Sequence, residues 1–282
     1  ALTGEAVQLY EARFGFNQNT HRIAVGEPLG QFYGYITEGL YQVDDFNYDV
    51  STQTYTLKDG VPYHGDKGRI RPGMWKFKNL TGDDNVIDEN DKTVIGNAQP
   101  KFYGGLNNSF TYKGFDLSIF LTFSYGNEVL NATKLVASKV GSLNYNALDV
   151  MNSSNRWMTI NSDGQKVTDP GELAALNAGK TVAAYHDAQQ GDNYIHSWAV
   201  EDASYLKLSN VTLGYTFPKK LIARVGLKNL RLYVTGNNLL TWTKYSGFDP
   251  EVSTMKSGLT PGVDFGAYPL SRSFIFGLNV AF

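Results

Sequence analysis

The sequence predicts an all-β protein, an antiparallel transmembrane β-barrel, and three observations lead to this fold class. Residues 271–282 follow a strict two-residue period, with large apolar side chains on one face and mostly small or polar ones on the other. Residues 102–125 show the same period, interrupted only by Lys113-Gly114. The connections between strands alternate between short and long, as they do in membrane barrels. A soluble all-β domain shares the two-residue period, so the pattern alone leaves that alternative open.

Composition narrows the class of protein further. The chain has 282 residues, enough for one large β domain or two small ones, and its net charge of −2 argues against a nucleic-acid-binding surface. It contains no Cys, which excludes disulfides, thiol catalysis and Cys-ligated zinc. No apolar run approaches the ~18 residues of a membrane helix. The first residue is Ala1, without a start Met or a signal peptide, so we expect a processed chain or a fragment.

The N-terminal third is less clearly patterned. The first thirty residues give little signal, and residues 44–67 are polar and turn-rich, which predicts a loop. Residues 31–41 are rich in aromatic side chains and predict one strand, and residues 73–78 predict a short one.

An acidic segment, residues 79–91, allows two interpretations. If Asp91 is the twelfth position of a calcium loop, Asp88 is the ninth and Asp84 the fifth, and oxygen ligands at such spacing suit a hard cation. Leu80 and Gly82 then occupy positions where ligands belong, so the front half of the loop fails unless an extra residue places Asn79 and Thr81 there instead. The segment is therefore either a Ca²⁺ site with Asp84, Asp88 and Asp91 as ligands or a solvated acidic turn.

The second half of the chain carries the clearest strands. We predict a hairpin over residues 102–125, strands at 204–217 and 230–235, and the terminal strand. Short helices are expected near residues 170–175 and 219–224. Two long loops, at about 126–203 and 241–270, alternate with the short connections. Since antiparallel strands place alternate connections at opposite ends, both long loops should emerge at one end. The short turns and the C-terminus should lie at the other.

The two faces of these strands should have different surroundings. The side chains expected to face lipid are Leu117, Ile119, Leu121, Phe274, Phe276, Leu278 and Val280. Those expected to face the barrel lumen are Asp116, Ser118, Thr122 and Asn279.

A resemblance to a known family covers nearly the whole chain, from about residue 23 to residue 282. Its most specific part is Val-Glu-Asp-Ala-Ser-Tyr-Leu-Lys-Leu at 200–208, continued by Val-Thr-Leu-Gly-Tyr at 211–215. The other matching stretches are residues 25–28, 32–35, 87–97, 100–102, 112–118, 236–241 and 247–251. In these stretches the sequence resembles the SusC/RagA family of TonB-dependent outer-membrane transporters.

The resemblance implies the C-terminal portion of a large barrel of about 22 strands, located in the outer membrane of Bacteroidetes. The family imports glycans or peptides, with a SusD-like surface lipoprotein as an extracellular lid and with energy from the TonB complex. The implied partners are therefore that lipoprotein, the TonB complex, outer-membrane lipid, the cargo and the remainder of the barrel and plug. The plug domain and the N-terminal strands are expected to be absent from residues 1–282. The family's aspartate-rich turn is degraded here, which puts an inherited calcium site in question.

Aromatic side chains in the long loops are the candidates for substrate or partner contact, because their faces stack on sugar rings. These candidates are Trp157, Tyr194, Trp198, Trp242, Tyr245 and Phe248. Trp and Tyr also form girdles at membrane interfaces, and for Trp242 and Tyr245, just past a predicted strand end, that alternative stays open. By resemblance, the terminal strand with Phe274, Phe276 and Phe282 presents a barrel-assembly signal. Phe282 could equally be one more girdle residue.

Two other function classes compete with the transporter. An enzyme such as a β-rich glycoside hydrolase needs two carboxylates facing each other across a cleft. The nearest candidates are Asp249 with Glu251, in a turn, and Glu201 with Asp202, whose side chains diverge. We therefore predict no enzymatic activity. The stronger rival is a soluble all-β glycan-binding module, which would bind its ligand without detergent.

Overall fold

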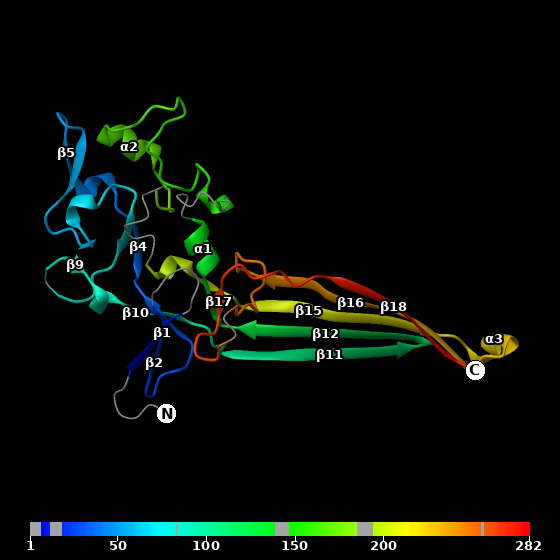
Figure 1. Cartoon of the computed structure of the whole chain (residues 1–282). Helices are drawn as coiled ribbons and strands as arrows, with labels where there is room; N and C mark the ends of the chain where they lie inside the picture. The colour runs from blue at the N-terminus through cyan, green and yellow to red at the C-terminus, as the bar shows by residue number, and fades with distance from the viewer. Residues whose placement is uncertain (1–6, 12–18, 83, 139–146, 185–193, 255–256) are drawn as a thin grey trace. The chain divides into compact units, whose positions relative to one another are not determined.

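The computed structural model describes residues 7–11, 19–82, 84–138, 147–184, 194–254 and 257–282 (Figure 1). The chain divides into two compact units. Unit 1 comprises residues 1–98, 130–200 and 253–265, and unit 2 comprises residues 99–129, 201–252 and 266–282. Within the described residues, no helix has the length and apolar character needed to cross a membrane.

Unit 2 is organised around one antiparallel sheet of five strands in the order β11-β12-β15-β16-β18 (Figure 1). Their bounds are β11 Phe102–Tyr112, β12 Phe115–Tyr125, β15 Tyr205–Thr216, β16 Asn229–Thr243 and β18 Ser273–Ala281. One short helix, α3 Lys219–Ile222, and the 3₁₀ turn Ala223–Val225 connect β15 to β16. The predicted hairpin, the strand at 204–217 and the helical turn are confirmed to within two residues.

The hairpin between β11 and β12 turns on only two residues. Lys113 and Gly114 have φ angles of +47° and +87°, the pair of positive values that a type I′ turn requires. A side chain on Gly114 would meet the carbonyl oxygen of Thr216 at 2.7 Å, so glycine is needed there for space as well as for conformation.

Unit 1 is an assembly of small sheets. Its largest sheet has the order β1-β2-β3-β10, and two-stranded sheets pair β4 with β8, β5 with β6 and β7 with β9. Strand β13 pairs in parallel with β17 through Leu130 and Val263. The bounds are β1 Val7–Glu11, β2 Asn19–Ala24, β3 Gln31–Gly34, β4 Thr37–Leu40, β5 Phe46–Asp49, β6 Thr54–Leu57, β7 Tyr63–His64, β8 Trp75–Phe77, β9 Val86–Ile87, β10 Thr93–Asn97, β13 Glu128–Asn131, β14 Val200–Asp202 and β17 Val263–Asp264, with β13 and β14 at the boundaries of the unit in sequence.

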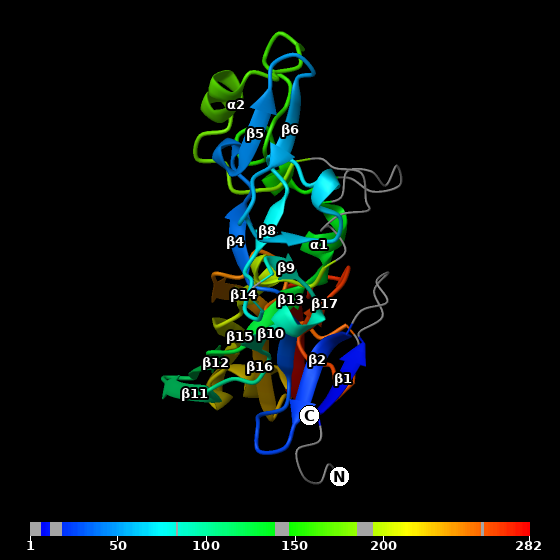
Figure 2. The same ribbon diagram turned by 90° about the vertical axis from the view of Figure 1, so that its left-hand side faces the viewer.

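Short helices complete unit 1. They are α1 Ala132–Ala137, α2 Pro170–Leu176 and the 3₁₀ turns Val43–Asp45, Lys67–Arg69, Glu89–Asp91, Asp149–Met151 and Ser197–Ala199. Helix α2 begins as its sequence predicts, with Asp169 accepting a hydrogen bond from the Glu172 N–H and Pro170 in the first turn. It lies beside the β5–β6 hairpin (Figures 1 and 2), where the Tyr55 hydroxyl donates to the Thr168 carbonyl at 2.7 Å.

Two sequence-based predictions for this region need correction. Residues 31–41 form two strands in different sheets, because Tyr35 pairs with residues 195–197 instead of continuing β3. Residues 44–67 contain the β5–β6 hairpin and β7 and are not simply a loop. Among the first thirty residues, for which the sequence predicts no element, the described part contains strands β1 and β2, which pair with each other.

Candidate functional site

The sheet of unit 2 has one face that is almost entirely apolar. The strand registers place Phe110, Leu117 and Leu213 side by side on it, followed by Val234 and Phe276. The members of this apolar face are Phe102, Leu106, Phe110, Tyr112, Phe115, Leu117, Ile119, Leu121, Phe123, Leu206, Leu208, Val211, Leu213, Tyr215, Leu230, Leu232, Val234, Leu240, Trp242, Phe274, Phe276, Leu278 and Val280. Many are exposed, Phe276 at 81% of its surface. A continuous apolar face of this extent requires an apolar environment.

The opposite face is polar and is connected by side-chain hydrogen bonds from strand to strand. Asn210 donates to Asn237 at 2.7 Å, and the hydroxyls of Thr212 and Thr235 lie 2.8 Å apart. On β12, Thr122 contacts Ser209 at 2.7 Å. The four residues predicted to face the lumen belong to this polar face, and the seven predicted to face lipid belong to the apolar one.

An ion pair on the polar face was not foreseen from sequence. Arg231 of β16 donates from Nε and Nη2 to the two carboxylate oxygens of Asp116 on β12, at 3.0 and 2.5 Å. Strand β15 lies between them, and the pair spans it because the intervening residue is Gly214. A Cβ at Gly214 would lie 2.5 Å from both Asp116 and Arg231. Only the register, which a sequence does not reveal, brings these three residues together.

The registers also sort the connections by length. Tyr112, Phe115 and Tyr215 are neighbours at one end of the sheet, together with the short turns and the C-terminus (Figure 1). Tyr125, Tyr205 and Thr243 lie towards the other end, where both long connections begin. This is the asymmetry that the alternating connection lengths predict. The second long connection begins after Thr243, three residues later than expected, because β16 continues that far.

The six aromatic candidates lie in different surroundings. Trp157 is 1% exposed in a core of unit 1, so its ring offers no surface to a partner in this structure. Tyr245 is 5% exposed and packs with Val129 and Ala203 in unit 2. Trp242 lies on β16, in the apolar face, rather than past the strand end as predicted, and Phe248 is 79% exposed. The structure therefore does not gather the six into one site.

Tyr194 and Trp198 belong to an aromatic cluster in unit 1. The Tyr194 ring packs edge-on against Tyr35, with ring centres 5.3 Å apart. Trp198 lies 4.9 Å from the ring of Trp75, and the Lys134 ammonium lies 4.2 Å above its centre. Both candidates are partly buried, so each has ring surface engaged with its own unit.

The carboxylates of the acidic turn are engaged in holding the turn itself. Asp91 is buried and accepts hydrogen bonds from the backbone N–H groups of Leu80, Thr81 and Asp88, at 2.6, 2.8 and 2.8 Å. Burial opposes ionisation, yet these donors outweigh it and hold the pKa of Asp91 below its usual range. Asp88 caps the following 3₁₀ turn through the Asn90 N–H. Among the described residues no cluster of three acidic or His side chains has metal-binding geometry. The calcium site stays a prediction that this geometry does not support. Residue 83, within the same segment, lies outside the described residues.

The carboxylates considered for catalysis are also bonded within unit 2. Glu251 accepts from the Tyr205 hydroxyl at 2.6 Å and from the Lys207 ammonium at 2.5 Å. Glu201 accepts from Ser246, and Asp202 accepts from the Ser204 N–H. These bonds fasten the connection after β16 to the start of β15 and do not form a catalytic pair.

An antiparallel sheet with one apolar face, one hydrogen-bonded polar face and connections sorted by length defines a portion of a transmembrane β-barrel. Comparison with known proteins makes the class more specific. No family model matches the chain. It is 33% identical over 270 residues to the TonB-dependent receptor P3 of Formosa agariphila, covering 94% of this chain and 23% of that protein. It is 27% identical over 224 residues to the TonB-dependent receptor SusC of Bacteroides thetaiotaomicron, covering 78% of this chain and 18% of SusC.

Solved structures show the same fold. A chain of the RagAB peptide importer in its closed-closed state aligns with a TM-score of 0.59 at 20% identity, covering 93% of this chain and 24% of that one. The open-open state aligns with a TM-score of 0.58, covering 96% and 25%. The protein belongs to the SusC/RagA family of TonB-dependent receptors, and it is a C-terminal portion of the barrel of such a receptor. It spans about a quarter of the length of the relatives it matches.

Proposed function

We propose that this chain is one part of an outer-membrane receptor, and that the whole receptor imports a glycan or a peptide across the outer membrane. Its two-faced sheet, together with the resemblance to TonB-dependent receptors over 94% of the chain, carries the proposal. The apolar face would lie against outer-membrane lipid, and the polar face would line the interior of the barrel with the plug. Energy would come from the TonB complex, and a SusD-like lipoprotein would cover the extracellular side.

The end of the sheet with the long connections is the one we assign to the extracellular side. Short turns on the periplasmic side and long loops outside are the rule for bacterial barrels. The connections at about 126–203 and 241–270 would then meet the lipoprotein or the cargo. Phe248, with most of its ring exposed, is the aromatic candidate best placed for such contact. Trp242, on the apolar face near the end of β16, suits a position at the lipid interface.

Cysteine labelling of intact cells tests this orientation. In the full-length receptor, Ser162→Cys and Ser246→Cys should react with a membrane-impermeant maleimide, because both lie in the long connections. Lys220→Cys, in α3 at the short-turn end, is the matched control and should react only after the outer membrane is permeabilised. The receptor without introduced Cys gives the background. The reverse labelling pattern would place the loops on the wrong side.

Import itself is tested by deleting the receptor gene. Growth on one class of polymer, glycan or peptide, should fall and should return when the wild-type receptor is supplied. The same receptor should not restore growth in cells that lack the TonB complex, and a lipoprotein should co-purify with it from outer membranes. Restoration without TonB would refute energised import, and purification without any lipoprotein would refute the assigned partner.

A further inference from the structure

The polar face of the five-stranded sheet carries aromatic rings as well as polar side chains. Tyr103 of β11 and Phe120 of β12 belong to this face, because the register pairs them with Ser124 and Asn107. Tyr103 is 78% exposed and Phe120 is 38% exposed. Contact with lipid, which accounts for the rings of the apolar face, does not account for these two, because they lie on the opposite side of the sheet.

The Phe120 ring lies over Gly105 of the neighbouring strand. A Cβ at Gly105 would lie 3.0 Å from Cε2 and 3.1 Å from Cζ of that ring. Gly105 pairs with Thr122, so the ring leans from its own position towards the end of the sheet where Tyr103 lies. Along β11 the polar face therefore presents Tyr103, then the Phe120 ring over Gly105, and then Asn107. The glycine gives the ring a place against the sheet.

Hydrogen-bonding groups lie beside these two rings. Asn107 accepts a hydrogen bond from the Ser118 hydroxyl at 3.2 Å through Oδ1, and its amide nitrogen donates to no group among the described residues. The Tyr103 hydroxyl also has no hydrogen-bond partner within the part of the chain that the structure describes. Rings combined with a few free polar groups are the usual composition of a small-molecule site.

The charges on the polar face are neutralised within unit 2. In the five strands only Asp116, Lys207 and Arg231 are charged, and all three lie on this face. Arg231 pairs with Asp116, and Lys207, which is 6% exposed, pairs with Glu251 at 2.5 Å. This part of the barrel wall therefore has no net charge, and each cation already has its carboxylate.

A wall of this composition favours one class of cargo. A peptide has a terminal ammonium and a terminal carboxylate, and an acidic polysaccharide has repeated anionic groups; neither finds an unpaired opposite charge on these strands. An uncharged sugar has apolar C–H faces that stack on aromatic rings and hydroxyl groups that bond to amides and phenols. It therefore matches both the rings and the polar groups of this face.

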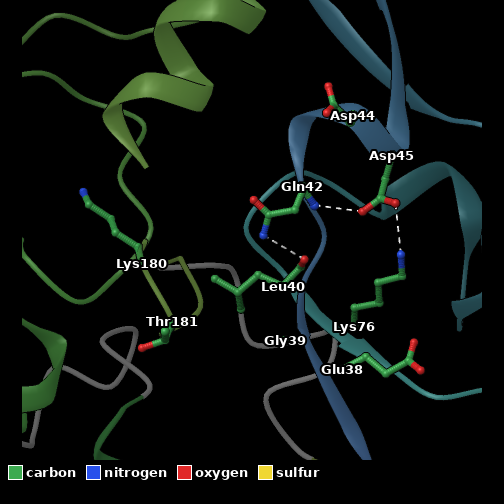
Figure 3. Close-up of a pocket in the computed structure, with 9 residues that line it drawn as sticks. All are labelled: Glu38, Gly39, Leu40, Gln42, Asp44, Asp45, Lys76, Lys180 and Thr181. Atoms are coloured by element: carbon green, nitrogen blue, oxygen red, sulfur yellow. Dashed lines mark hydrogen bonds and ion pairs between the residues drawn. The ribbon is translucent and has the colours of Figure 1, made fainter. Parts of the chain in front are cut away.

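The pocket in unit 1 does not offer a comparable arrangement. It has a volume of about 720 Å³ and lies between β4 with Lys76 on one side and the segment after α2 on the other (Figure 3). In Figure 3 the Lys180 ammonium and the carboxylates of Glu38 and Asp44 point away from the space between these walls. The charged groups of the pocket therefore do not surround one ligand.

We propose that Tyr103, Phe120 and Asn107 form a carbohydrate-binding platform on the inner wall of the barrel, and that the cargo of the receptor is an uncharged glycan. This inference rests on the proposed function, in which the polar face lines the barrel interior. Sugar rings stack on Tyr103 and Phe120, and a sugar hydroxyl accepts a hydrogen bond from the Asn107 amide. A further strand paired with β11 extends the wall beside the platform and leaves its face open, because side chains project perpendicular to the sheet.

The class of cargo is tested with the purified full-length receptor and three pools of probes. The pools are uncharged oligosaccharides from starch, mannan and xylan, oligogalacturonates, and tryptic peptides of casein. Mass spectrometry of the molecules retained after washing should identify an uncharged oligosaccharide. Retention of only peptides or only oligogalacturonates, or of nothing, would overturn the inference. TonB-dependent growth on peptides would also overturn it while leaving the proposed import intact, so the two failures can be distinguished.

Variants test the platform with the retained oligosaccharide as the ligand in a calorimetric titration. Tyr103→Ala and Phe120→Ala should each weaken binding by about two- to tenfold, whereas Tyr103→Phe and Phe120→Tyr should keep most of the affinity. Phe102→Ala is the matched control, since it removes a neighbouring ring from the apolar face and should bind like the wild type.

Thermal unfolding of the same variants separates binding from packing against the plug. Lower stability of Tyr103→Ala and Phe120→Ala with unchanged affinity would assign the two rings to packing and overturn the platform. Equal weakening of binding by Phe102→Ala would overturn it as well, because the effect would then not depend on the face of the sheet.

Discussion

A charged side chain placed on each face of β12 tests the lipid assignment of the sheet most directly. Strand β12 has 11 residues, about 37 Å at about 3.4 Å per residue, and a tilt of about 45° reduces its height to about 26 Å. This height matches the apolar band of a barrel, and Ile119 lies near its middle. Its neighbours on the apolar face are Val211 of β15 and Asn108 of β11.

Ile119→Arg should therefore lower the free energy of unfolding by about 2–4 kcal/mol, the cost of a cation at mid-membrane on a barrel's lipid face. Ser118→Arg is the matched control, because its side chain lies on the polar face and donates to Asn107 at 3.2 Å. Losing that bond costs about 1 kcal/mol, and the polar face can solvate the guanidinium.

The measurement is urea unfolding of the full-length receptor in lipid vesicles, with the two variants compared with the wild type. The amount of each variant assembled in the outer membrane should follow the same order. Equal destabilisation at positions 118 and 119 would show that the two faces do not have different surroundings.

Three further outcomes are expected. If the terminal strand is an assembly signal, deleting Phe282 should sharply lower the amount of receptor assembled in the outer membrane. If Phe282 is only a girdle residue, its loss should lower the free energy of unfolding by about 1.5–3 kcal/mol and leave the receptor assembled. Normal surface levels would therefore refute the assembly signal. Gly214→Ala should break the Asp116–Arg231 pair and lower the free energy of unfolding by about 1–3 kcal/mol. Gly258→Ala should be neutral, because no atom lies within 4 Å of its new Cβ. Equal effects of the two variants would contradict the role of Gly214. Burial lowers the pKa of both His21 and His64 to about 4, and for His21 it outweighs the opposing effect of the hydrogen bond to the Pro261 carbonyl. In the unfolded chain both histidines take up a proton near pH 6.5, before they do so in the folded protein. The free energy of unfolding of unit 1, measured by hydrogen exchange, should therefore be highest above pH 6.5, fall by about 3 kcal/mol per histidine towards pH 4 and level off below pH 4. His64→Phe should remove about half of this loss. A flat profile between pH 6.5 and 4 would exclude the linkage.

The strands of unit 2 could be predicted from sequence because each separates two different environments. Along β12 and β18, apolar and polar side chains alternate residue by residue, which indicates that the two faces have different surroundings. Strand β16 was predicted too short because a bulge at Asn238, with φ of +51°, interrupts its alternation.

The division of residues 31–41 into two strands escaped prediction because the partner of Tyr35 is distant in sequence. Tyr35 donates its N–H to the Ile195 carbonyl at 2.9 Å, across 160 residues, and this bond ends β3. Gly34 permits the approach, because a Cβ there would collide with the Ile195 carbonyl. The sequence pattern around residue 35 does not predict a contact with a residue so far along the chain.

The candidate site was predictable where it depends on alternation and unpredictable where it depends on burial. The division of the side chains into an apolar and a polar face follows from the two-residue period alone. Trp157 looks like an exposed loop aromatic in sequence, yet its ring packs over Gly73, where a Cβ would lie 2.3 Å from the ring. The pocket between Lys76 and Lys180 joins residues that are about a hundred positions apart, so it became visible only in the structure.

The edges of the sheet explain why the receptor must continue beyond the strands described for unit 2. Strands β11 and β18 each pair on one side only within the five-stranded sheet, so each carries a row of backbone N–H and C=O groups on its free side. Exposed to water, such an edge can be solvated; in lipid, each unpaired group costs several kcal/mol. An 11-residue edge and a nine-residue edge would together cost far more than the 5–15 kcal/mol by which a domain is stable. The apolar face requires lipid, and lipid requires both edges to be paired. Therefore β11 and β18 must hydrogen-bond to further strands of the receptor, and the sheet is stable in the membrane only as part of the closed barrel.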